Sequence, residues 1–386
     1  MSQKRIRGLV VTVVALLAAV SLAALAGAQE SPQVPGLAPI ATGLSNPRHL
    51  AFGADGALYV AEAGSGGNQC TPVGEGQLCV GETGAITRIE GGLQDRITTD
   101  LVSWANEEAE EATGPHDVAW DAQGNLMVIV GLGNDPNNRA DTGPFGALGV
   151  NFGQLVQIAA DGSWTNVIDV AAYEATANPD GGALDSNPYA LERVDDGFLV
   201  ADAGANALLH VADSGDITTV AVFPNRMVEF PPGSGNMMPM QAVPTSVAVG
   251  PDGAYYVGQL TGFPFPVGGA NVYRVVPSEE PEVFADGFTN VVDIAFDDDG
   301  NLYVVEIAAN GLLSGDPTGA LIRVDDEGNQ TVLASKGLFM PGGVAVGDDG
   351  LIYVTTGAAV PDIGTVVRIP ARPTVYLPII VPPGTP

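Results

Sequence analysis

Basic residues, cysteine and histidine are scarce in this chain. Its 386 residues include 14 lysines and arginines against 45 aspartates and glutamates, which gives a formal net charge of −31. Nucleic acid and anionic lipid surfaces are therefore excluded as main partners, because binding to them needs a basic patch. The chain has two cysteines and three histidines, with no Cys/His metal cluster. It also lacks a Gly-x-Ser-x-Gly elbow and a phosphate-binding loop.

Glycine and proline are abundant, with 51 and 29 residues, and 46% of the chain is hydrophobic, which fits a large all-β protein. At the N-terminus, basic residues precede an apolar run (8–26) and an A-x-A site that ends at Ala28. This pattern indicates an export signal cleaved after Ala28; a retained membrane anchor is the alternative. We therefore expect a secreted or extracytoplasmic protein, in the periplasm or at the cell surface, with no membrane span once the signal is removed.

The two cysteines, Cys70 and Cys79, lie in one short segment. In an exported chain such a pair is expected to form a local disulfide.

Six segments of the chain repeat one pattern. In each, an anchor residue (proline in all but one) precedes alternating apolar residues, a glycine and an "LYV"-like run, and the copies begin at Asn46, Gly114, Asn187, Val243, Asn290 and Met340. The pattern predicts a β-hairpin whose turn glycine has a positive φ. Each copy continues with a third strand and most with a fourth, which predicts an all-β, six-bladed β-propeller of four-stranded antiparallel blades.

The sixth copy lacks its fourth strand, and "APIATGL" (38–44) near the N-terminus matches that strand. We expect this N-terminal strand to complete the last blade and close the ring. The domain organisation is then a signal peptide (1–28), the propeller (29–372) and a Pro-rich apolar tail (373–386). The tail is expected to be disordered or loosely packed; an extra edge strand or an attachment segment is the alternative. A monomer is expected.

The long connections of the predicted blades all leave from one face of the disc, opposite the hairpin turns. They cover 63–83, 102–113, 131–151, 171–186, 224–242, 260–269 and 307–318. A scaffold that lengthens its loops on one side only favours a binding site on that side.

Polar residues near the strand ends are expected around the channel mouth on the loop-rich face. The candidate binding residues are Arg48, His49, Asp117, Tyr189, Gln259 and Asp293. Carboxylates from alternate blades, Glu62, Asp202 and Glu306, are candidate ligands of a divalent cation, calcium or magnesium, because hard cations take oxygen ligands. The alternative is that each of these acids caps a loop by accepting backbone hydrogen bonds.

His116 is the candidate catalytic residue, because histidine is the usual general base near neutral pH and this one lies on the presumed functional face. A hydrogen-bonded structural histidine is the alternative.

Several stretches, among them "ANPDGGALDSNPYAL", "VADAGANALLHV", "AVFPNR" and "GPHDVAWDAQGN", resemble the ScyD/ScyE family of exported β-propellers. The resemblance covers nearly the whole mature chain and implies the fold but no established reaction. More distantly, Pro-His before a strand and an acid after "LYV" are similar to virginiamycin B lyase and to NHL-repeat, gluconolactonase-like and quinoprotein sugar dehydrogenase propellers. The lyase resemblance implies His116 as a base and Glu62 and Glu306 as metal-holding acids.

Two functions follow as hypotheses. The favoured one is an exported binding propeller that holds a small molecule, a glycan or a protein partner on its loop-rich face. The other is a metal-dependent lyase or hydrolase with His116 as base and Glu62, Asp202 and Glu306 near the ion.

Overall fold

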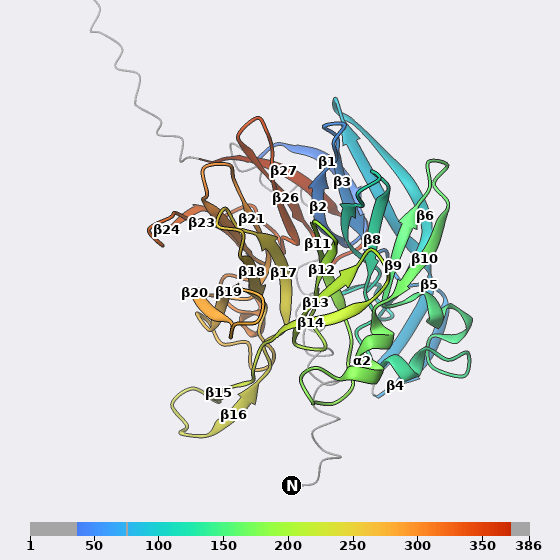
Figure 1. Ribbon diagram of the computed structural model, residues 1–386, viewed down its shortest axis with the longest axis horizontal. Helices are drawn as coiled ribbons and strands as arrows, with labels where there is room; N and C mark the ends of the chain where they lie inside the picture. The colour runs from blue at the N-terminus through green and yellow to red at the C-terminus, as the bar shows by residue number, and fades with distance from the viewer. Residues whose placement is uncertain (1–36, 75, 372–386) are drawn as a thin grey trace, which may run out of the picture.

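The sequence repeats form six antiparallel sheets that make a β-propeller in the computed structural model (Figure 1). Each blade has four strands, and the first carries one additional strand. The structure describes residues 37–74 and 76–371. The predicted signal peptide and C-terminal tail lie outside these residues. Among the described residues, no helix has both the length and the apolar character that crossing a membrane requires.

The strands fall into four concentric sets. The innermost are β2 (Pro47–Phe52), β7 (Pro115–Trp120), β11 (Pro188–Val194), β17 (Pro244–Val249), β21 (Val291–Phe296) and β25 (Gly343–Val346). The second are β3 (Leu58–Glu62), β8 (Leu126–Val130), β12 (Gly197–Asp202), β18 (Tyr255–Gln259), β22 (Leu302–Glu306) and β26 (Leu351–Thr356). The third are β5 (Gly76–Glu90), β9 (Gln154–Ile158), β13 (Ala207–Ala212), β19 (Ala270–Val275), β23 (Ala320–Val324) and β27 (Gly364–Pro370). The outermost are β6 (Leu93–Ala105), β10 (Trp164–Asp169), β14 (Ile217–Val222), β20 (Glu282–Phe288), β24 (Gln330–Ala334) and β1 (Pro39–Leu44).

The ring closes as the sequence predicts. Strand β1, from the N-terminal end of the described chain, pairs antiparallel with β27 and so supplies the outermost strand of the last blade. Buried hydrophobic clusters fill all six interfaces between neighbouring blades. One set of equivalent residues, three positions after each anchor, contributes to all of them: Leu50, Val118, Leu191, Val247, Ile294 and Val344. Burial between blades is therefore the main force that holds the ring together.

The turn glycines confirm the hairpin prediction with one exception. Gly56 and Gly124 have φ of 77° and 81°, and the other equivalents are similarly left-handed. The prediction of positive φ is wrong for Gly197, which is the first residue of β12 and is absent from the left-handed set. A Cβ there would lie 2.3 Å from the carbonyl oxygen of Val211 in β13, so this glycine is needed for close strand packing.

The loop-rich face carries additional short elements. These are β4 (Gln69–Val73), α2 (Ala171–Ala177), the paired strands β15 (Arg226–Glu229) and β16 (Met237–Met240), and the 3-10 helices η1 (Pro136–Arg139), η2 (Gly146–Asn151) and η3 (Leu312–Ser314). In Figure 1, β4, α2 and β15–β16 all lie at the lower end of the view. The predicted disulfide is present: Cys70 and Cys79 face each other across the β4–β5 hairpin, with an S–S distance of 2.03 Å.

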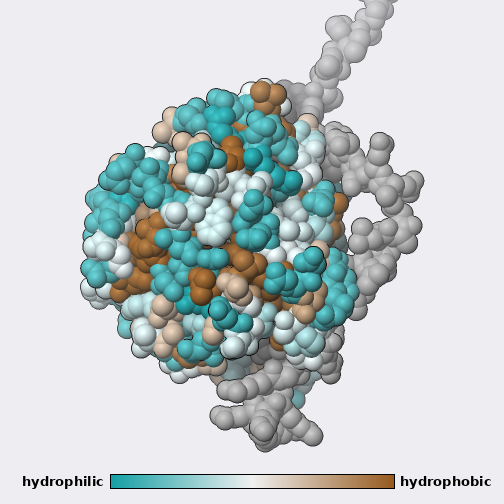
Figure 2. Space-filling view, turned by 90° about the vertical axis from the view of Figure 1, so that its right-hand side faces the viewer, coloured by the Kyte–Doolittle hydropathy of each residue, from teal (hydrophilic) through white to brown (hydrophobic). Residues whose placement is uncertain are grey.

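Hydrophilic residues cover much of the side of the molecule that faces the viewer in Figure 2. Figure 2 shows hydrophobic areas that are separated by mostly hydrophilic residues on one side of the molecule.

Val243 has an unfavourable backbone conformation that asparagine relieves in two other blades. Val243 has a φ of 55° and directly precedes an anchor proline. Asn46 and Asn290 hold the equivalent position in two other blades, with φ of 49° and 52°. Left-handed φ costs a β-branched residue about 1–2 kcal/mol, and asparagine less. We expect Val243→Asn to raise the free energy of unfolding by about 1 kcal/mol, measured by urea denaturation. Val249→Asn, at a half-buried strand valine, is the control and should destabilise; equal effects of the two changes would contradict this explanation.

Candidate functional site

The central channel contains a cavity of about 520 Å³ lined by all six innermost strands. Its walls run from the level of His49 to the strand ends at Phe52, Trp120 and Phe296. These end residues are half-buried, whereas His116 and Thr245, nearer the loop-rich face, are only 1% and 2% exposed. The cavity therefore opens toward the hairpin turns, although the sequence favoured a site on the loop-rich face.

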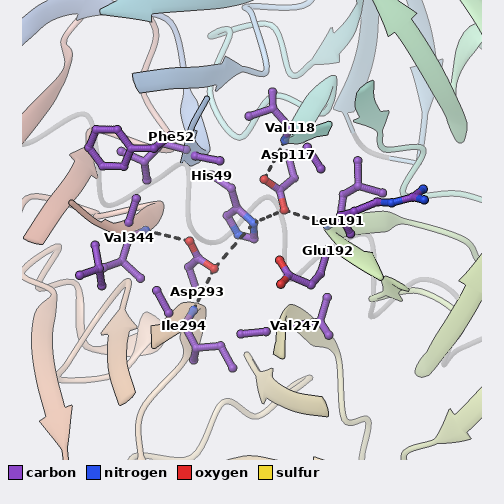
Figure 3. Close-up of a pocket in the computed structure, with 18 of the residues that line it drawn as sticks. His49, Phe52, Asp117, Val118, Leu191, Glu192, Val247, Asp293, Ile294 and Val344 are labelled. Atoms are coloured by element: carbon purple, nitrogen blue, oxygen red, sulfur yellow. Dashed lines mark hydrogen bonds and ion pairs between the residues drawn. The ribbon is translucent and has the colours of Figure 1, made fainter. Parts of the chain in front are cut away.

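His49 lies at the inner end of the cavity between two carboxylates (Figure 3). Its Nδ1 is 3.2 Å from Asp117 Oδ2 and 3.8 Å from Asp293 Oδ1, and its Nε2 is 3.1 Å from the carbonyl oxygen of Val292. The Val292 carbonyl oxygen can only accept a hydrogen bond, and Asp117 Oδ2 is the acceptor within reach of Nδ1, so both ring nitrogens carry protons. Burial alone would lower the pKa of His49, but the charges of Asp293 and Asp117 outweigh it and raise the pKa to about 9. His49 is therefore a fixed positive charge at neutral pH.

Asp117 and Asp293 also join neighbouring blades. Asp117 accepts hydrogen bonds from the backbone N–H of Val118, in its own strand, and of Leu191, in the next blade. Asp293 repeats this arrangement with the N–H groups of Ile294 and Val344. Burial raises the pKa of Asp293 to about 7 against the opposing charge of His49. Because His49 contacts both carboxylates, one buried network connects five of the six blades.

Glu192 is the ionisable side chain that faces the cavity one level nearer the turns. At the equivalent position, four after the anchor, the other five innermost strands have alanine: Ala51, Ala119, Ala248, Ala295 and Ala345. The carboxyl points into the space enclosed by the strands, toward the side chains of His49 and Asp293 (Figure 3). Burial, with smaller contributions from those two charges, raises the pKa of Glu192 to about 7. A carboxylate in an alanine-lined cavity is suited to pair with a cationic group.

His116, Arg48 and Tyr189 lie together on the loop side of His49. The His116 Nδ1 is 3.1 Å from the carbonyl oxygen of Pro188, and the Tyr189 ring is 4.5 Å from His116 and 5.3 Å from His49 between centroids. Burial, then the positive charge of Arg48, hold the pKa of His116 well below its usual range. The Arg48 guanidinium donates to the carbonyl oxygen of Ala112, so a loop lies over this end of the channel.

The candidate metal-binding acids end the second strands of three separate blades. Each accepts a backbone N–H from just before its own innermost strand: Ser45 for Glu62, Asn187 for Asp202 and Thr289 for Glu306. Arg96 forms an additional ion pair with Glu62 at 2.7 Å. Among residues 37–74 and 76–371, no three Asp, Glu, His or Cys side chains form a group that could hold a metal ion. The structure thus does not bring Glu62, Asp202 and Glu306 together.

Gln259, the equivalent residue of blade 4, makes similar local contacts. Its Nε2 donates to the carbonyl oxygen of Ala242, and its Oε1 accepts from the N–H of Asn271 and from Arg226. This residue therefore connects blade 4 to the β15–β16 segment and lies outside the cavity lining.

The structure therefore brings three of the predicted binding residues, His49, Asp117 and Asp293, into one cluster, with Tyr189 beside them. Sequence reasoning missed Glu192. The signal was present in the repeat alignment, where one glutamate stands against five alanines.

Comparison with known proteins supports the fold. No protein-family model and no curated protein matches this chain. Among solved structures, a gluconolactonase from Xanthomonas campestris is similar with a TM-score of 0.53 at 11% identity, covering 86% of this chain and 89% of its own. A putative glucose dehydrogenase from Thermus thermophilus has a TM-score of 0.48 at 18% identity, covering 86% and 99% of the two chains. The inactive virginiamycin B lyase of Staphylococcus aureus, solved with quinupristin, has a TM-score of 0.46 at 13% identity, covering 86% and 98%.

The fold and the similarity to the gluconolactonase structure place this protein in the class of six-bladed β-propellers. Because propellers host many unrelated activities, the class by itself gives no substrate.

Proposed function

We propose that this protein is an exported binding propeller, of the kind that the ScyD/ScyE resemblance implies, and that it holds a small organic cation in its central channel. The observation that carries the proposal is Glu192, a carboxyl in a cavity otherwise walled at its level by alanine. The volume of about 520 Å³ lies within the usual range for small-molecule sites. This favours a small molecule over the glycan and protein partners that the sequence also allowed.

The charges around the cavity favour a cation over an anion. Asp117, Asp293 and Glu192 supply three carboxyl groups to the cavity. Of the two basic side chains in its lining, His49 lies between Asp117 and Asp293, and Arg193 forms an ion pair with Asp213, which is outside the lining. Asp117 and Asp293 accept backbone hydrogen bonds, so their oxygens are already occupied. Glu192 has a single backbone contact, with Val249 of the next blade, so the rest of its carboxyl can form the ion pair. The alanine methyl groups can contact the apolar part of the ligand. An ammonium or amidinium group on a compact hydrocarbon body fits these requirements.

The test is a binding screen on the mature protein. Primary amines, quaternary ammonium ions and amidines are compared with neutral and anionic molecules of the same shape, by thermal shift and then by calorimetry. We expect cations to bind and their neutral counterparts to fail. Glu192→Gln should weaken binding by about 30-fold or more, because a buried charge partner is worth upwards of about 2 kcal/mol.

Two controls separate the ion pair from general effects. Glu192→Ala places alanine at this position in all six innermost strands. It should also abolish binding without loss of folding. Glu282→Gln removes one negative charge at an exposed position of β20 and should leave the affinity unchanged. Equal affinity of wild-type protein and Glu192→Gln would overturn the proposal.

The second candidate remains a metal-dependent lyase or hydrolase, and one observation favours it. Since the carbonyl oxygen of Pro188 can only accept, His116 carries its proton on Nδ1 and its Nε2 is free to act as a base. Against it, the side chain is 1% exposed, and the acids that would hold the metal are engaged in separate blades. The binding function therefore has the stronger geometric support.

A further inference from the structure

Three buried oxygen atoms without a hydrogen-bond partner lie in one segment of the loop-rich face, 174–185. They are Glu174 Oε2, Asn178 Oδ1 and Asp185 Oδ1. Glu174, in α2, is 1% exposed. Buried polar atoms are nearly always paired, because an unpaired one loses its water without compensation. Each of these oxygens can still accept a hydrogen bond or coordinate a cation.

The three residues are close together. The backbone N–H of Asp185 lies 3.5 Å from Oε1 of Glu174, the other oxygen of the carboxyl whose Oε2 has no partner. Asn178 caps the C-terminus of α2 with φ of 40°, and its Nδ2 donates to the carbonyl oxygen of Gly182, which leaves Oδ1 unpaired. The segment thus folds back on itself, so that the backbone of Asp185 lies against the Glu174 carboxyl while Asn178 ends the same helix.

Further carboxyl groups lie near Glu174 and Asp185. Asp202 and Asp180 are near both residues, and the Glu174 side chain is buried. Asp135, before η1, adds a further negative charge near Asp185. Acidic groups crowded in this way are destabilised unless a cation neutralises them.

We propose that residues 174–185 bind one calcium ion, with carboxylate oxygens of Glu174 and Asp185 and the amide oxygen of Asn178 as side-chain ligands. The set contains two acids and one amide, in agreement with the finding that no three acidic, histidine or cysteine side chains of the described chain form a metal-binding group. Backbone carbonyls and water complete the coordination. The site lies apart from the channel cavity, none of whose lining residues it shares.

The ligand chemistry selects calcium. All three donors are hard oxygens, which excludes soft thiophilic metals and gives no advantage to metals that prefer imidazole. Magnesium demands a small, regular octahedron, whereas calcium accepts irregular loops with amide and backbone oxygens. The irregular segment that joins α2 to β11 fits the second description.

The test uses the mature protein after chelation. Metal content is measured after dialysis against calcium, terbium luminescence reports the site directly, and melting temperature is followed during calcium and magnesium titrations. We expect one calcium per chain and a rise in Tm of about 5 °C at a 100-fold excess of calcium over Kd. Magnesium at the same concentration should give a clearly smaller rise.

Two variants keep the fold and remove ligands. Asp185→Asn is isosteric, and Asn178→Gly tolerates the left-handed backbone while deleting the amide oxygen. Both should lose the bound calcium and at least 10-fold in terbium affinity. The double variant Asp298→Asn/Asp299→Asn removes two exposed acids and should bind calcium as the wild type does. Equal calcium binding by all these proteins, or none by the wild type at millimolar calcium, would overturn the proposal.

The outcome is independent of the channel. Glu192→Gln should retain the calcium ion even though it loses the organic cation, and Asp185→Asn should retain the organic cation. Failure of one proposal is thus distinguishable from failure of the other.

Discussion

Replacing His49 by glutamine is expected to lower the free energy of unfolding by about 3–5 kcal/mol, the usual cost of leaving a buried charge without its partner. The change removes the positive charge between Asp117 and Asp293, which lie 3.2 Å and 3.8 Å from Nδ1. Both carboxyls then remain in the core with only backbone donors. The measurement is urea-induced unfolding at pH 7, followed by tryptophan fluorescence.

The chain offers a matched control for this prediction. His210 also pairs with an aspartate, Asp196, at 3.0 Å, but the side chains are 22% and 81% exposed. Exposed pairs are worth about 0–1 kcal/mol, so His210→Gln should change stability by no more than that. If the two substitutions cost the same, the buried network does not hold the blades together. The double variant His49→Gln/Asp293→Asn should recover part of the loss, because it removes one of the two stranded charges.

Stability is expected to be greatest near pH 5 and to fall continuously toward pH 9. Asp293 and Glu192 have pKa values of about 7 in the folded protein, above their unfolded values of about 4. The folded state therefore binds more protons between these limits, and stability decreases as pH rises through this window. For His49 the folded pKa is about 9 against 6.5 unfolded, so its contribution is complete below pH 6.5 and is lost as pH rises toward 9. Thermal melts at half-unit intervals of pH test this prediction.

The change of stability with pH also depends on the ionisable groups that surround His49. They are Asp117 on β7, Asp293 on β21 and Glu192 on β11, with His116 nearby and held neutral. Arg48, next to His49 on β2, donates to the carbonyl oxygen of Ala112. In His49→Gln/Asp293→Asn the fall between pH 7 and 9 should become flatter, because the histidine that loses its proton there is gone, as is the carboxyl whose pKa would rise into this range without it. An unchanged slope in this variant would contradict the assigned protonation of His49.

The fold could be predicted from sequence because a propeller repeats its local signals. Alternating apolar residues, the turn glycine and the anchor proline recur in each copy, and the N-terminal match to the missing fourth strand predicts ring closure, which β1 confirms. The disulfide followed from two cysteines in one short segment. Gly197 lacks the positive φ of the other turn glycines because its hairpin is one residue shorter. The glycine at this position instead allows β12 and β13 to pack closely.

The site was less predictable, because it depends on where side chains point after the strands are curved into a ring. Sequence position placed His49, Asp117 and Asp293 near the channel, but their pairing depends on the irregular register at the start of β2, β7 and β21. Glu62, Asp202 and Glu306 have equivalent positions in the repeat, yet each makes contacts within its own blade. The repeat alignment shows where a residue lies within its blade. It does not show which side chains or backbone groups that residue contacts.

The most direct test of channel binding is a crystal structure of the mature protein with a brominated version of the organic cation that binds best. The proposal predicts anomalous bromine density inside the channel, with the cationic group within ion-pair distance of the Glu192 carboxylate, and no such density in Glu192→Gln. Bromine density on the loop-rich face, or in the channel of both proteins alike, would contradict it.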